Sequence, residues 1–141
     1  MSPISRRSAL RAGSATLFVG LSGCSFSQTD NSMIALELLN TDTSPHTVGI
    51  EFLRVDGGDE MSTRYEGEID VDMKDAEGAG LAVREELLPS GPYLVRANIE
   101  GEPISDHYHL YPRCDGRAEY LRVSILTEED ASGFEFYHSC S

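Results

Sequence analysis

The chain has 141 residues, a length that suits one ordinary domain with a single hydrophobic core. Its 24 acidic side chains outnumber the 11 basic ones and give a formal net charge of −13. This charge argues against nucleic acid and anionic membrane surfaces as binding partners, because both would repel so negative a protein.

The first 23 residues show the order of features typical of an export signal. Arg6 and Arg7 form a basic pair near the start, residues 12–20 are modestly apolar, and Leu21-Ser22-Gly23 leads into Cys24. The apolar stretch is too short to cross a bilayer core of about 30 Å as a helix. These features predict a cleaved signal peptide over residues 1–23, and an uncleaved segment lying on the membrane is the alternative.

Two motifs within this segment resemble known signals. Residues 5–10 (Ser-Arg-Arg-Ser-Ala-Leu) resemble the twin-arginine export signal, with Ala9 where that family usually has phenylalanine. Residues 21–24 resemble the lipobox of prokaryotic lipoproteins, whose cysteine becomes the N-terminal residue and carries a lipid. The resemblance implies that Arg6 and Arg7 direct export of the folded chain. It also implies that a lipid on Cys24 anchors the protein at the extracytoplasmic face of the cell membrane.

Residues 24–32 are polar after the cysteine, and we expect them to be a lipidated N-terminus and tether. Because the predicted leader contains three of the basic residues and no acidic one, the remainder is more acidic than the whole chain. Lys74 is the only lysine. An acid-rich, lysine-poor composition resembles that of proteins from halophilic archaea, and an ordinary acidic secreted domain is the alternative.

From residue 33 onward, apolar and polar residues alternate in short runs, which indicates half-buried β-strands. The first strands are expected at residues 34–38 and 48–52. A hairpin turn is expected at residues 56–59 (Asp-Gly-Gly-Asp), where glycine accepts a positive φ. Residues 61–71 are more polar, as in an edge strand. Residues 81–88 fit either a strand or a short helix, before a clear break at Pro-Ser-Gly-Pro.

The second half of the chain continues the alternation. Tyr93, Val95, Ala97 and Ile99 form an inward row, and further strands are expected at residues 107–111, 121–125 and 134–136. Seven or eight short strands predict an all-β fold, a single β-sandwich over residues 33–141. Its topology is expected to be immunoglobulin-like or transthyretin-like, with a small closed barrel as the alternative.

Three cysteines are present, and lipidation of Cys24 leaves Cys114 and Cys140. In an oxidising compartment a disulfide is the expected state of two such thiols. This disulfide would hold the C-terminal strand against the loop that precedes Leu121. Two free thiols, or two separate metal ligands, are the alternatives.

His107 and His109 are two residues apart in a predicted strand and therefore share one face. Such a pair can bind copper or zinc if further ligands converge, from His46, His138 or a carboxylate. Paired histidines on an exposed strand are more often without a metal, so no metal site and no cofactor are predicted. Copper or zinc binding by His107 and His109 is kept as the alternative function.

No pattern in the sequence predicts catalysis. Residues 70–77 have some likeness to a calcium loop, but Lys74 occupies a ligand position and the distal glutamate is missing, so a solvated acidic loop is expected. Nucleophile elbows, HExxH, phosphate loops and dinucleotide fingerprints are absent. We therefore expect a lipid-anchored extracytoplasmic protein that is not an enzyme and acts by binding or assembling with another extracytoplasmic protein.

Overall fold

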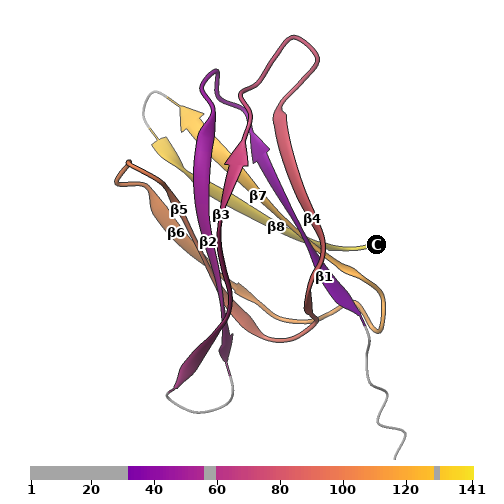
Figure 1. Cartoon of the computed structure of the whole chain (residues 1–141). Helices are drawn as coiled ribbons and strands as arrows, with labels where there is room; N and C mark the ends of the chain where they lie inside the picture. The colour runs from indigo at the N-terminus through magenta and orange to yellow at the C-terminus, as the bar shows by residue number, and fades with distance from the viewer. Residues whose placement is uncertain (1–31, 56–59, 129–130) are drawn as a thin grey trace, which may run out of the picture.

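The computed structural model describes residues 32–55, 60–128 and 131–141. Within these residues the regular elements are all β-strands, arranged as two four-stranded sheets that pack face to face (Figure 1). In chain order they are β1 (Met33–Asn40), β2 (His46–Val55), β3 (Met61–Val71), β4 (Gly80–Pro89), β5 (Tyr93–Ile99), β6 (Ser105–Leu110), β7 (Glu119–Glu128) and β8 (Ala131–Cys140). The predicted all-β sandwich is confirmed.

The strand order can be compared with the topologies that the sequence predicts. One sheet has the order β4-β1-β7-β8 and the other β3-β2-β5-β6. Neighbouring strands are antiparallel, except that β1 and β7 run parallel. An immunoglobulin domain keeps its first two strands in one sheet, whereas β1 and β2 lie in different sheets. The observed order therefore differs from that of an immunoglobulin domain, and the two separate sheets do not close into a single barrel.

The core lies between the sheets and is built from the predicted inward rows. In β5, Val95 and Ala97 are buried while Arg96 and Asn98 are exposed, as a period of two requires. Phe52 is fully buried, and its ring makes edge contacts with the rings of Tyr65 and Tyr93. The buried core residues are Ile34, Leu36, Leu38, Val48, Ile50, Phe52, Ile69, Val71, Tyr93, Val95, Ala97, Ile99, Leu110, Leu121, Val123, Ile125 and Phe134.

The edge strands agree with the polar character of their sequences. β3 is the edge that its polar sequence predicts, and β4, which the sequence left open as strand or helix, is an edge strand paired with β1. Pro89 is the last residue of β4, a position where a missing N–H is tolerated. The predicted turn at residues 56–59 lies outside the described residues.

Where the structure describes the chain, no helix has the length and apolar character needed to cross a membrane.

Candidate functional site

A buried polar cluster lies at the end of the sandwich where β7 begins and β8 ends. Glu119 continues the inward row of β7, and His138 continues the inward row of β8. In the antiparallel ladder Glu119 pairs with Cys140, and His138 pairs with Leu121. The two polar side chains are each only 2% exposed, and Glu119 Oε2 lies 3.1 Å from His138 Nε2. The strand alternation thus places an acid and an imidazole side by side at the rim of an apolar core.

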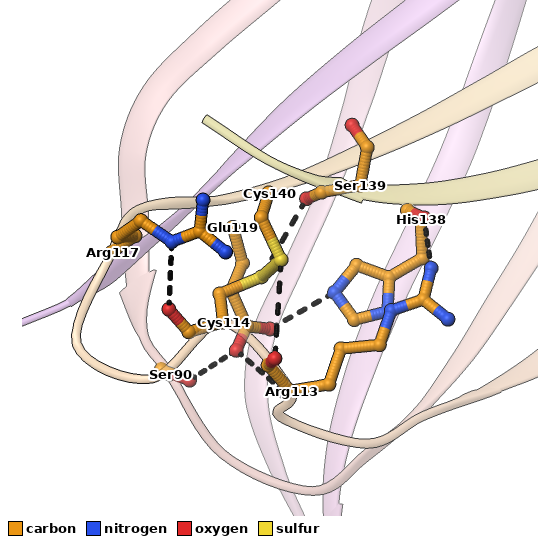
Figure 2. A network of polar contacts seen from close by, with 8 residues as sticks. All are labelled: Ser90, Arg113, Cys114, Arg117, Glu119, His138, Ser139 and Cys140. Atoms are coloured by element: carbon orange, nitrogen blue, oxygen red, sulfur yellow. Dashed lines mark hydrogen bonds and ion pairs between the residues drawn. A yellow bond between two sulfur atoms is a disulfide. The ribbon is translucent and has the colours of Figure 1, made fainter.

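Two further donors from loops hold the Glu119 carboxylate (Figure 2). The Ser90 hydroxyl donates to Oε1 at 2.9 Å, and the backbone N–H of Arg113 donates to the same oxygen at 3.2 Å. The Arg113 guanidinium donates to the backbone carbonyl of His138. Burial of a carboxylate is costly without such partners. These donors therefore fix the carboxylate in one orientation, with Oε2 aimed at the imidazole.

The environment of His138 keeps its imidazole neutral. Burial lowers the pKa of His138 below 6.5, the charge of Arg113 lowers this pKa further, and the charge and hydrogen bond of Glu119 partly oppose both. A carboxylate can only accept a hydrogen bond, so Nε2 carries the proton of the neutral ring. The pair is therefore an N–H donor bonded to a carboxylate acceptor.

The two cysteines lie beside this pair. Cys114 is in the loop between β6 and β7 and is 1% exposed, and Cys140 is the last residue of β8. The structure brings them to disulfide distance, with 5.4 Å between their Cα atoms, and so joins the C-terminal strand to the loop before Leu121 as expected. The Cys114 sulfur, a Glu119 carboxylate oxygen and a His138 ring nitrogen all lie within 4.8 Å of one another. We call Cys114, Glu119, His138 and Cys140 the rim cluster.

A second candidate is an acidic groove on the outer face of the β3-β2-β5-β6 sheet, with a volume of about 820 Å³. Gly49 helps to form its floor, because a Cβ at this position would lie 2.5 Å from the Asn98 side-chain oxygen. The charged side chains that line the groove are mostly acidic: Glu51, Glu66, Glu68, Glu100 and Asp106, with Arg96 and His107. The groove therefore favours a positively charged ligand.

His107 and His109 lie on one exposed face of β6, as predicted. Their ring centroids are 5.8 Å apart, and the Tyr111 ring stacks on His109. In the described part of the chain, neither histidine belongs to a group of three closely spaced ligand atoms. Of the further ligands considered, His46 contacts Asp42 at 2.8 Å, and His138 is bonded to Glu119 in the rim cluster.

In the acidic loop between β3 and β4, one carboxylate is hydrogen-bonded to the backbone of the loop itself. Asp75 Oδ1 accepts hydrogen bonds from the backbone N–H groups of Glu77 at 2.8 Å and Gly78 at 3.1 Å. This is an Asx-type turn, in which the side chain stabilises the loop backbone.

The export and lipidation residues Arg6, Arg7 and Cys24 lie outside the described residues. The structure therefore leaves their predicted roles as predictions.

Sequence reasoning did not single out Glu119, and it considered His138 only as a remote ligand for the β6 histidines. A signal was present in the strand rows. Glu119 stands two residues before Leu121, and His138 stands two residues after Phe136, so both fall on the inward parity. A charged residue at an inward position requires a buried partner.

Comparison with known proteins found no relative of this chain. No protein-family model, no curated protein and no solved structure matches the chain at a significant level.

Proposed function

We propose that this chain is an extracytoplasmic lipoprotein that acts as a non-enzymatic binding module for a basic segment of another extracytoplasmic protein. The observation that carries the proposal is the acidic groove on the β3-β2-β5-β6 sheet. The anchor is inferred from the leader and from Cys24, and the binding role from the groove.

The charge arrangement in the groove supports a cationic ligand. Glu51 on β2 stands directly opposite Glu66 on β3, and Gly49 stands opposite Glu68. Like charges directly opposite one another destabilise a sheet. Arg96 on β5 reaches Glu51, with 3.5 Å between Nη1 and Oε2. A bound lysine or arginine side chain would lower the repulsion between the β2 and β3 carboxylates in the same way.

The shape of the groove favours a segment of another protein over a small compact ligand. The lining residues come from all four strands of this sheet and from the turn after β5. The groove thus extends across the whole width of a sheet face, whereas small-molecule sites are concave and bury most of the ligand. A peptide segment with alternating basic residues can lie across such a face and meet several carboxylates.

Calorimetric titration of the full chain in detergent with a lysine-rich peptide tests this function. The variant Glu66→Gln/Glu68→Gln is expected to bind at least tenfold more weakly than the wild type. The matched control is Glu85→Gln/Glu135→Gln, which removes two exposed carboxylates from the other sheet. Affinity should also fall with added salt, because exposed charges are screened. Equal affinity of the two double variants would contradict the groove as the binding site.

A second candidate function is copper or zinc binding by the β6 histidines. The observation in its favour is the shared exposed face of His107 and His109, with ring centroids 5.8 Å apart. Titration of the chain with Cu²⁺ and Zn²⁺ tests it against the variant His107→Ala/His109→Ala. This candidate fails if the double variant keeps the metal affinity of the wild type.

A further inference from the structure

We propose that reduction of the Cys114–Cys140 disulfide turns the rim cluster into a binding site for a thiophilic divalent cation such as Zn²⁺. The ligands are the sulfur atoms of Cys114 and Cys140, one carboxylate oxygen of Glu119 and Nε2 of His138. These are the donor types that Zn²⁺ takes in proteins, and their number matches its tetrahedral coordination.

The distances are close to those of a metal site. The Cys114 sulfur, the Glu119 oxygen and the His138 nitrogen already lie within 4.8 Å of one another. Around a tetrahedral Zn²⁺ with bonds of about 2.0–2.3 Å, ligand atoms lie about 3.4–3.8 Å apart. For these three atoms a contraction of about 1 Å is therefore enough, and rotation of the freed Cys114 side chain can supply part of it. Cys140 stands opposite Glu119 in the ladder, so its sulfur can reach the fourth position.

The surroundings orient the ligands as a metal site requires. Ser90 and the Arg113 backbone both donate to Glu119 Oε1, which leaves Oε2 directed at His138. Such outer hydrogen bonds orient the ligands of metal sites and strengthen binding. A cation bound to Glu119 Oε2 and His138 Nε2 replaces the proton that Nε2 now carries in this hydrogen bond. The imidazole then carries its proton on Nδ1.

The charges also balance. Two thiolates and the Glu119 carboxylate carry three negative charges, and Zn²⁺ together with the Arg113 guanidinium carries three positive ones. The guanidinium is already bonded to the carbonyl of His138. A buried site whose charges sum to zero avoids the large cost of an uncompensated charge.

The chemical steps are simple. A dithiol reductant gives two electrons and two protons to the disulfide, so that the protein S–S bond breaks and an S–S bond forms in the reductant. Binding of Zn²⁺ then releases the two thiol protons. In the disulfide form neither sulfur is a thiolate, so the metal can bind only after reduction. The metal is therefore held or released according to the redox state of the cysteines.

The proposed export route would expose the site to two compartments of different redox state. This part of the inference, and no other, rests on the proposed function. A chain that folds before export first meets the reducing cytosol, where thiols persist, and then an oxidising compartment, where disulfides form. The folded domain would hold the cation before export. In the oxidising compartment a disulfide oxidant accepts two electrons from the thiolates and two protons from solvent and becomes a dithiol, the protein S–S bond forms again, and the cation is released.

Cobalt spectroscopy tests the site without relying on the export proposal. The full chain carrying Cys24→Ser, which removes the third thiol, is titrated with Co²⁺ before and after treatment with a phosphine reductant. The phosphine becomes its oxide with oxygen from water and adds no competing thiol. The reduced protein should show a sulfur-to-cobalt charge-transfer band and the intense visible bands of tetrahedral Co²⁺, saturating at one equivalent and lost on adding Zn²⁺. The oxidised protein should show neither band.

Variants identify the ligands. Glu119→Gln should weaken Co²⁺ binding at least tenfold, and Ser90→Ala, which removes only the outer hydrogen bond, by about tenfold. Glu135→Gln, which removes an exposed carboxylate from β8, is the matched control and should leave the spectrum unchanged. Absence of the sulfur band in the reduced wild type overturns the proposal, as do bands that vanish in the control. A reduced chain that loses its β-sheet circular dichroism and does not regain it with Zn²⁺ overturns it as well, because the site requires the folded sandwich.

Discussion

Replacing Cys114 and Cys140 together by alanine is expected to lower the free energy of unfolding by about 3.5 kcal/mol. The two residues are 26 positions apart in the sequence. In the chain-entropy model a cross-link over a loop of this length removes about 12 cal/mol/K from the unfolded chain, which is about 3.5 kcal/mol at 25 °C. Cys114 is also almost fully buried, so loss of its packing adds to this value.

Urea denaturation with a metal chelator present measures this effect. With a slope of about 1–3 kcal/mol per molar urea, the unfolding midpoint should fall by about 1.2–3.5 M. Reduction of the wild type should give a similar midpoint, and reduction of the double variant should change nothing. A loss of less than about 1 kcal/mol, or a variant that remains sensitive to the reductant, would refute the assignment of this stabilisation to the disulfide.

Three further predictions concern His138 of the rim cluster, the hydrophobic core and a buried amide on β1. Because the pKa of His138 is lowered from 6.5 in the folded state, the unfolded chain binds more protons, and stability should fall as pH falls from 6.5 towards that lowered pKa. An NMR titration that places the pKa of His138 above 6.5 would contradict this. Phe52→Ala should cost about 3–5 kcal/mol, because its fully buried ring leaves a cavity; urea midpoints check this, and a loss below about 1 kcal/mol would mean that the site is not core. Asn40→Ala should cost about 1–3 kcal/mol in the same assay, because the Asn40 amide donates to the carbonyls of Ser44 and Asp72, and an unchanged midpoint would show that water replaces these bonds.

The fold was largely predictable because each strand repeats its signal along its length. Rows such as Val95 and Ala97 in β5 place several apolar residues on one face, and no other secondary structure buries all of them together. The β4 segment was ambiguous because its run Arg84-Glu85-Glu86 interrupts the alternation. In the structure the register of β4 against β1 shifts along this part of the strand, and Glu86 has a φ of 50°. Such an irregularity depends on the neighbouring strand, so periodicity alone does not show it.

The order of strands was less predictable, because it depends on which rows face one another across the sandwich. The alternation of β1 and β2 is the same whether the two strands pair in one sheet, as in an immunoglobulin domain, or lie in opposite sheets. The loop between them, residues 41–45, is short in both cases. Only packing of the whole chain distinguishes the two arrangements.

The candidate sites follow the same distinction between local and long-range information. The shared face of His107 and His109 is a local property of one strand and was predicted. The rim cluster joins the start of β7, the end of β8 and the loop between β6 and β7, and the groove joins four strands, so neither is local. The pairing of Cys114 with Cys140 was predictable because, once Cys24 is assigned to the lipid, two thiols remain.

The state of Cys24 is the feature on which the setting of both proposals depends, since it decides whether the sandwich lies outside the cytoplasm at a membrane. Intact-mass measurement of the protein extracted from cell membranes tests it most directly. The expected species begins at Cys24, carries the mass of a lipid on that residue, and loses membrane association when Cys24→Ser is introduced. A mature protein that retains residues 1–23, or a Cys24→Ser variant that remains wholly with the membranes, would contradict the anchor.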